Sequence, residues 1–209
     1  MDILTPPKPS PRPTSAKARP GGRTHQVSRR IYAASLRLIE TRGYAALNFQ
    51  EVAEAAGVAR STLYRRWASR AELALDAIGV AVRDQVSFPD TGSLEGDLRA
   101  TLRQIADFIR SPQGTAVLAA GLEIRQAQPD LDPSDRRWAR RSLEVAELFV
   151  RAKARDEIGA TFDWEVAFAR AAGALYFRIQ VMHLGIDAAW IERIVADVML
   201  GARASLVEL

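Results

Sequence analysis

The sequence predicts an all-α protein of about nine helices, with a small N-terminal domain followed by a larger helical bundle. Three observations lead to this fold class. Apolar residues recur at the spacings of one helix face along most of the 209-residue chain. No segment shows the alternation that a half-buried strand requires. Turn-forming residues fall at or near the gaps between the helical segments, at Pro112, Pro129, Pro133, Gly159 and Gly185.

Composition excludes several classes of protein. Apolar residues make up 48% of the chain, which is enough for a sizeable core, but no uninterrupted apolar run is long enough to span a membrane. The N-terminus has no apolar segment of the secretory type. Cysteine is absent, and the two histidines are far apart at His25 and His183. We therefore expect a cytoplasmic protein without disulfides, metal site or cofactor.

Charge is unevenly distributed along the chain. Residues 1–75 hold 13 Lys and Arg against 5 Asp and Glu, whereas the remainder holds 16 against 20. A basic N-terminal third on a mildly acidic body indicates a head that binds a polyanion. Residues 1–25 hold six of the prolines and five basic side chains with little to bury, so we expect a disordered basic tail. Its charge would help non-specifically, or alternatively it would contact phosphates.

The first domain is expected over residues 26–75. Helical spacing runs from Gln26 to Arg42, and Gly43 fits the left-handed position that ends a helix. Asn48 with Glu51 has the pattern of a capping box at the start of a second helix, and Gly57 turns the chain into a third helix over 60–66. Ser69 with Glu72 repeats the capping pattern and begins a longer helix through about Val86.

The second domain is expected over residues 76–209. A turn-rich loop over 88–93 is followed by helical patterns at 94–110, 113–127, 134–155, 163–184 and 187–206.

The short helix pair at 49–66 is the most informative feature of the sequence. Val58 and Leu63 are expected to plug the small core, which leaves the basic, hydroxyl-rich side of residues 60–66 exposed. A helix of this kind, held after a glycine turn, can enter the major groove of DNA. The sequence therefore predicts a DNA-binding protein.

The stretch from Val52 to Leu73, with its Thr-Leu-Tyr-x-x-Trp segment at 62–67, resembles the N-terminal domain of the tetracycline-repressor family of transcriptional regulators. Gly43-Tyr44 also fits, and the resemblance covers about residues 27–75. The chain departs from the family pattern at two places: Asn48 stands where Ser or Thr is common, and Ala59 stands where Ser is common, so a cap of the third helix is lost. Arg70 stands at the frequent lysine position.

The resemblance implies DNA-contacting residues at the turn and along the third helix. Hydroxyls can bond to phosphates or base edges, and arginines can pair with phosphate or with a guanine edge. The candidates are Asn48, Phe49, Arg60, Ser61, Thr62, Tyr64, Arg65, Arg66 and Arg70. Leu63 and Trp67 are expected in the core, with Trp67 packing the third helix against the first and fourth.

The helix expected at 163–184 is apolar over most of its circumference, so it needs cover on both sides. One side can meet its own core and the other a second copy. Together with the next helix it would form a four-helix interface between two subunits, as the resemblance implies. The candidate interface residues are Trp164, Phe168, Ala171, Leu175, Ile179, Ile191, Val195 and Val198. An interior helix of a monomer is the alternative.

The body is also expected to enclose a mostly apolar effector pocket. The candidate lining residues are Phe108, Leu118, Leu122, Arg125, Trp138, Leu148, Tyr176 and His183, each of which could instead be ordinary core or helix-end residues.

The predicted function is a ligand-responsive repressor that binds a palindromic operator as a homodimer. An effector would shift the helix at 69–86 and so change the separation of the two recognition helices. A non-specific, nucleoid-type DNA-binding protein is the alternative. An enzyme is not expected, because the chain has no nucleophile elbow, phosphate loop, zinc-protease motif or dinucleotide turn.

Overall fold

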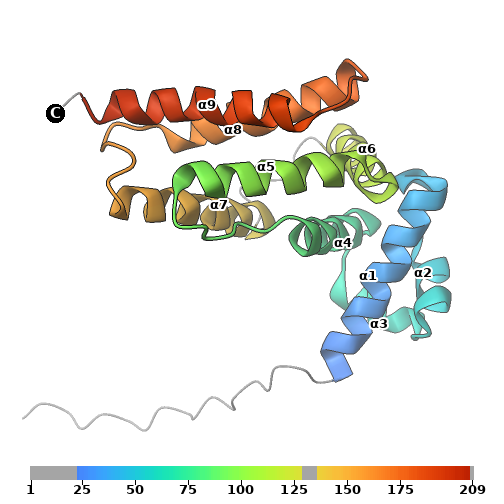
Figure 1. Cartoon of the computed structure of the whole chain (residues 1–209). Coiled ribbons are helices and arrows are strands. Elements are labelled where there is room, and N and C mark those ends of the chain that lie inside the picture. The colour runs from blue at the N-terminus through green and yellow to red at the C-terminus, as the bar shows by residue number, and fades with distance from the viewer. Residues whose placement is uncertain (1–22, 129–135, 208–209) are drawn as a thin grey trace, which may run out of the picture.

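The computed structural model describes residues 23–128 and 136–207, with side chains for 24–128 and 141–207. This part of the chain is all-α, as predicted, with a helix-turn-helix head beside a larger bundle (Figure 1). Nine α-helices lie within it: α1 (Arg23–Arg42), α2 (Phe49–Ala56), α3 (Arg60–Arg66), α4 (Arg70–Gln85), α5 (Leu94–Arg110), α6 (Pro112–Ala127), α7 (Arg136–Ala154), α8 (Trp164–Tyr176) and α9 (Ala188–Ser205). No helix in these residues has the length and apolar character needed to cross a membrane.

The N-terminal tail predicted over 1–25 lies outside the described residues up to residue 22. Helix α1 begins at Arg23, a few residues earlier than the predicted start at Gln26. After α1, Gly43 adopts φ 78° and ψ 168°, which is a positive-φ extended conformation and not the left-handed helical one expected. A short 3-10 turn, η1 (Tyr44–Ala46), then brings Tyr44 into the head core.

Two helices join the head to the bundle. The first turns of α4 bury Leu73 and Ala74 in the head core, whereas Ala77 and Ala81 further along the same helix belong to the body core. Helix α6, a body helix in sequence order, closes the head core through residues such as Ile124, which is 1% exposed. The head therefore rests on α4 and α6 together.

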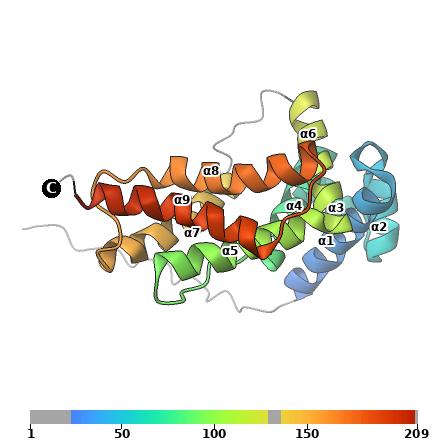
Figure 2. The same ribbon diagram turned by 45° about the horizontal axis from the view of Figure 1, so that its top comes forward.

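The bundle is arranged around α5. Helices α8 and α9 form one outer layer, α5 lies beneath them, and α7 lies below α5 in the view of Figure 1 (Figures 1 and 2). Leu98, Leu102 and Ile109 of α5 are fully buried. Arg99 of α5 holds Glu192 of α9, with 2.7 Å between Nε and the carboxylate, so the outer layer is tied to the middle one by charge as well as by apolar contact.

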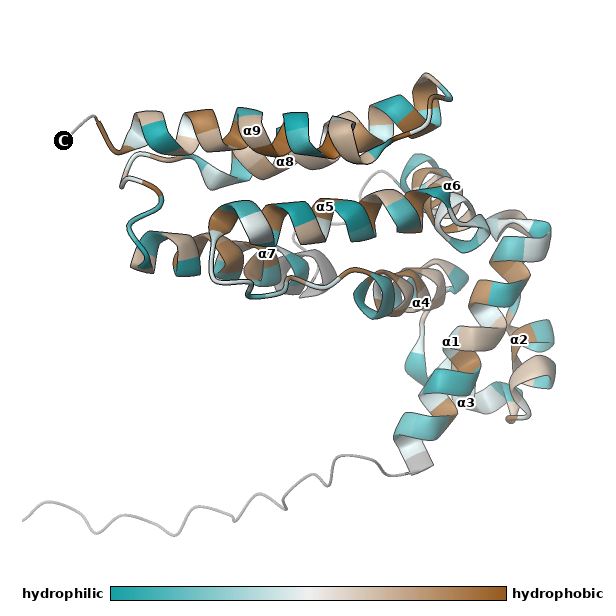
Figure 3. Cartoon of the chain, in the orientation of Figure 1, coloured by the Kyte–Doolittle hydropathy of each residue, from teal (hydrophilic) through white to brown (hydrophobic). Residues whose placement is uncertain are grey.

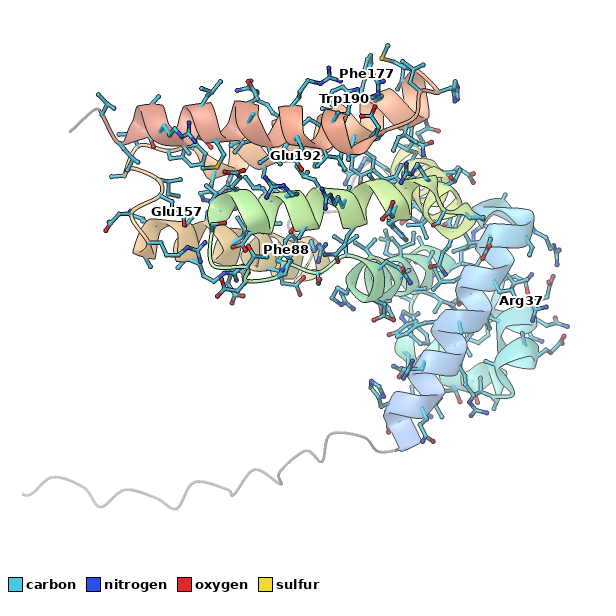
Figure 4. The ribbon with its side chains drawn as sticks, in the orientation of Figure 1. Arg37, Phe88, Glu157, Phe177, Trp190 and Glu192 are labelled. Carbon is cyan, nitrogen blue, oxygen red and sulfur yellow. The ribbon has the colours of Figure 1, made fainter. Side chains whose placement is uncertain are left out.

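The loop between α4 and α5 is held by arginines of α7. Arg141 donates to the carbonyl of Val86 at 3.1 Å and its guanidinium lies 4.3 Å from the ring centre of Phe88. Arg151 donates to the carbonyl of Pro89 at 3.0 Å. Figure 4 shows Phe88 on the α7 side of this loop. A displacement of α7 would therefore act on the end of α4.

The helix predicted over 163–184 is interrupted. Helix α8 ends at Tyr176, and a π-helical turn, η2 (Phe177–Val181), follows before the chain turns to α9. His183 lies beyond it at φ 53°, so it is at the helix end. Figure 3 shows that this connection is hydrophobic over much of its length.

Candidate nucleic-acid interface

The turn between α2 and α3 is built by local hydrogen bonds. Asn48 caps α2: its Oδ1 accepts from the backbone N–H of Glu51 at 2.9 Å, and its Nδ2 donates back to the Glu51 carboxylate at 2.9 Å. The Glu51 carboxylate thus accepts from the Asn48 side chain, whereas in a standard capping box it accepts from the backbone N–H of the cap residue. At the other end, Gly57 adopts the left-handed conformation at φ 62° and ψ 47°, and Val58 N–H bonds to Ala53 O. This closing pattern favours glycine and fixes where α3 begins.

The first turn of α3 has no side-chain cap. Ala59 occupies the cap position and offers only its carbonyl, which accepts from Thr62 N–H at 2.9 Å. The predicted loss of a cap here is therefore present in the structure. The first turn of α3 is therefore stabilised by packing and not by a side-chain cap.

The inner side of α3 is anchored by Leu63 and Trp67. Leu63 is fully buried, and Trp67 is 3% exposed. The Trp67 indole donates to the carboxylate of Asp76 on α4 at 2.7 Å, and its ring packs edge-on against Tyr32 of α1. Trp67 therefore joins the end of α3 to both α1 and α4, as expected. This anchoring turns the opposite side of α3 outward.

The outward side of α3 carries the predicted contact residues. Arg60, Ser61, Tyr64, Arg65 and Arg66 are exposed, and Thr62 is half-buried. Arg60 and Arg65 make no hydrogen bond or ion pair with another side chain in the described part of the chain. Among the predicted contact residues, these two cations are the most available to an anionic partner.

Phe49 was a candidate DNA contact, but it lies inside the head and not on its surface. It is 8% exposed, and its ring packs edge-on under that of Tyr64 with 4.9 Å between centroids. Tyr64 itself is 61% exposed. Phe49 therefore positions Tyr64 and offers little surface of its own.

Two of the predicted cations are already oriented by the protein. Arg66 donates to Ser28 Oγ at 2.9 Å and lies over the Trp67 ring. Arg70 donates to the carbonyl of Ala45 at 2.9 Å and lies over a second aromatic ring of the head. Such contacts restrict a flexible side chain and leave some of its N–H donors free for a phosphate.

The structure also brings part of α1 to this surface, a contribution that the sequence did not predict. Ser28 receives the bond from Arg66, and a guanidinium nitrogen of Arg30 lies 3.7 Å from where a Cβ on Gly57 would be. The basic run at Arg29 and Arg30 on the polar side of the first helix was the available signal. Its proximity to α3 follows only from the packing.

A carboxylate lies beside this basic surface. Glu51 accepts from Asn48 and forms an ion pair with Arg42. The hydrogen bond from Asn48, followed by that from Arg42, lowers the pKa of Glu51 below its usual value. Glu51 is thus ionised and engaged within the head at neutral pH.

The structure does not bring the predicted effector residues together. Phe108 and Leu148 are buried in the body core, and Leu118 packs against it, whereas Leu122 is 65% exposed. Arg125 and His183 are also exposed, and the side chain of Trp138 lies outside the described ones. Tyr176 is 37% exposed; burial of its hydroxyl raises its pKa, partly offset by the charge of Arg141. These positions lie on different sides of the bundle. The sequence grouped them because helical spacing alone does not say which side of each helix faces inward.

Five of the predicted dimer-interface residues lie in the core of their own chain and not on its surface: Ala171, Leu175, Ile191, Val195 and Val198 are at most 6% exposed. Trp164, Phe168 and Ile179 are half-buried and pack against that core, and their place in an interface stays a prediction.

The outward sides of α8, η2 and α9 carry other apolar residues. Val166, Phe177, Val181 and Leu200 are 53%, 57%, 62% and 65% exposed. Figure 4 shows Phe177 at the outer edge of this layer. We call these four residues the outer apolar face.

Two open hollows lie elsewhere on the described surface. One, of about 300 Å³, lies between the start of α8 and the end of α9. The other, of about 400 Å³, lies between the end of α1 and α6. None of the predicted effector residues lines either hollow. No cluster of three metal-ligating side chains occurs among the described residues.

Comparison with known proteins agrees with this architecture. Residues 31–77 match the family model described as bacterial regulatory proteins, tetR family, and residues 88–198 match the tetracyclin repressor-like C-terminal domain.

Individual proteins match over most of the chain. The chain is 31% identical to the HTH-type transcriptional regulator AqdR of Rhodococcus erythropolis, over 76% of this chain and 75% of that protein. It is 32% identical to the DNA-binding transcriptional repressor TetR of Mycobacteroides abscessus, over 81% of this chain and 90% of that protein. The crystal structure of the TetR family transcription regulator SCO0332 superposes with a TM-score of 0.69 at 31% identity, covering 84% of this chain and 98% of that one. The chain therefore belongs to the TetR family, whose members are DNA-binding transcriptional regulators and not enzymes.

Proposed function

We propose that this protein is a ligand-responsive repressor that binds a palindromic operator as a homodimer. The observation that carries the proposal is the outward side of α3, where Arg60, Tyr64 and Arg65 are exposed on a helix anchored from behind by Trp67. A rigid helix with free guanidinium groups can read base edges and pair with phosphates in a major groove. Family membership supports the regulatory role.

A single short helix reads few base pairs, so two copies are needed for a specific site. The outer apolar face supplies a surface for the second copy, because four large apolar side chains in one layer are costly to leave in water. A two-fold dimer places its recognition helices on half-sites about 34–36 Å apart or a multiple of that spacing. The operator would then be an inverted repeat.

The response to an effector would travel through α4. Its first half lies in the head core and its second half in the body core. Arg141 and Arg151 hold the loop at its end to α7. A small molecule that displaces α7 would tilt α4 and change the separation of the recognition helices, so that both half-sites are no longer met together.

Selection of genomic fragments by the purified protein, followed by a footprint at about 150 mM salt, tests the DNA-binding part. We expect a discrete inverted repeat that Arg65→Ala and Tyr64→Phe weaken. Arg203→Ala is the matched control, because Arg203 is an exposed arginine in the last turn of α9, far from the head. Uniform binding with no enriched site would instead indicate a non-specific DNA-binding protein.

Sedimentation tests the dimer. Phe177→Glu places a charge in the outer apolar face and should shift the protein toward monomer. Leu122→Glu is the matched control, because Leu122 is equally exposed but lies on α6. A monomeric wild-type protein, or an equal shift in the control, would contradict this interface.

A further inference from the structure

We propose that the hollow between the end of α1 and α6 is a second small-molecule site, which takes an organic dication with a hydrocarbon body. The two helices lie side by side where the head meets the bundle (Figures 1 and 2). The hollow has a volume of about 400 Å³, which falls in the range of small-molecule sites. We call it the junction hollow.

The floor of the junction hollow is apolar, and its residues are fixed by packing in the head core. Ile39, Tyr44 and Ala120 line it and are 1%, 5% and 1% exposed, so each is held by the head core below. Ala116 and Ala119 of α6 line it beside Ala120. Their short side chains leave room above the helix, so a hydrocarbon chain can lie against it and lose its contact with water.

The rim of the junction hollow is acidic on both sides. Glu40 of α1 and Glu123 of α6 are exposed lining residues, and neither has a hydrogen bond or ion pair with another side chain that the structure describes. Among the described residues, no Lys or Arg lines the hollow. An apolar floor flanked by two carboxylates that have no described side-chain partner is complementary to a cation at each end of a hydrocarbon chain, and it repels anions.

The two walls come from helices that are far apart in the chain. Glu40 and Tyr44 belong to the head, whereas Ala119 and Glu123 are on α6, which packs in both the head core and the body core. A ligand that contacts both walls fixes α1 against α6, so its binding free energy is coupled to that of DNA through the position of the head. This site is separate from the effector region proposed inside the body and does not depend on it.

Calorimetry on the full chain tests the site, with decamethylenediamine as the probe and decamethylene glycol as the uncharged control of the same length. Exposed ion pairs contribute little each, so we expect the diamine to bind about fivefold more tightly than the glycol. Glu40→Gln and Glu123→Gln should each weaken diamine binding about twofold to threefold. Glu147→Gln, an exposed carboxylate of α7, should leave it unchanged. Equal binding of diamine and glycol, or no effect of either glutamine variant, would overturn the proposal.

A second variant tests occupancy of the hollow without changing charge. Ala119 is exposed, so Ala119→Phe fills the space without disturbing the core and should abolish diamine binding. Unchanged binding by this variant would also overturn the site.

The coupling is tested with DNA. Because diamines also bind DNA directly, operator affinity is compared between wild type and Ala119→Phe at the same diamine concentration. We expect the diamine to change the wild-type affinity more. Equal changes would overturn the coupling. Operator binding without diamine is measured in the same series, so failure of the DNA-binding proposal itself is seen separately.

Discussion

The buried carboxylate of Asp97 is expected to contribute strongly to the stability of the body. Its side chain is fully buried near the start of α5. It accepts from the backbone N–H of Thr91 at 2.6 Å and from the Thr91 hydroxyl at 2.7 Å. Arg155, directly after α7, and Arg151 of α7 approach it at 3.3 and 3.5 Å. We expect Asp97→Asn to destabilise the protein at neutral pH, because the amide keeps the shape but loses the charge.

The magnitude follows from these contacts. A hydrogen bond to a charged group contributes about 1.5–3 kcal/mol, against about 0.5–1.5 kcal/mol for a neutral one, so the two Thr91 bonds lose about 1 kcal/mol each. The two arginines lose one acidic partner but keep their ion pairs with Asp90. Because both guanidinium groups are partly exposed, this loss adds about 1 kcal/mol. The total is about 3 kcal/mol. For a chain of this size that corresponds to a Tm lower by roughly 6–12 °C.

The effect depends on pH with a definite sign. Burial alone would raise the pKa of Asp97, but the bonds from Thr91 and Arg155 and the charge of Arg151 outweigh it and hold the pKa below its usual value. A carboxyl with a depressed pKa in the folded state contributes its stability above its unfolded pKa of about 3.9, and this contribution is lost as the pH falls through the folded pKa. The difference between wild type and Asp97→Asn should therefore be full at neutral pH and shrink in acid.

Urea unfolding followed by circular dichroism, at neutral pH and at several acidic pH values, measures this difference. Asp107→Asn on the same helix is the matched control, because Asp107 is 71% exposed and pairs with Arg110 on the surface, so its loss should cost less than about 1 kcal/mol. A difference for Asp97→Asn below about 1 kcal/mol at neutral pH, or one that stays constant into acid, would refute the reasoning.

Three further outcomes are expected. Arg65→Ala should weaken operator binding and, if Arg65 pairs with one phosphate, reduce the slope of log affinity against log salt by about 0.9, whereas Arg203→Ala should change neither; titrations at several salt concentrations show which holds. Asn48→Ala removes the α2 cap and should lower the free energy of unfolding by about 1 kcal/mol in urea; no change would show that the cap is not needed. Trp67→Phe removes the hydrogen bond from the indole to the charged Asp76, so it should cost about 1.5–3 kcal/mol in the same assay and weaken operator binding because α3 loses its anchor; a stable variant that binds DNA normally would contradict that role.

The head was predictable from sequence because its signals are local. Asn48 and Ser69 cap the helices that follow them, and Gly57 adopts the left-handed turn, all through bonds that span a few residues. The side of α3 that faces outward followed from the apolar positions of Leu63 and Trp67. The resemblance of residues 27–75 to a known family reached the same conclusion by a second route.

The body was predictable only as a set of helices. Except for α8, which ends at Tyr176 before a π-helical turn, their bounds agree closely with the predicted ranges, because periodicity and turn residues are local too. The inward side of a helix that is apolar all round is not a local property. Leu175 and Val195 were therefore assigned to the interface, although they lie in the core, and Phe177 and Leu200 were not selected.

The sequence by itself determined the fold class, the helix bounds, the cap and turn of α2 and the exposed basic side of α3. Each rests on residues a few positions apart, where backbone geometry decides which groups can meet. Only the tertiary structure decided that Ile124 of α6 closes the head core, that Arg66 meets Ser28, and that Asp97 pairs with arginines at the end of α7 and directly after it. These contacts join residues far apart in the chain, and their partners are set by how helices pack against one another, which no local pattern specifies.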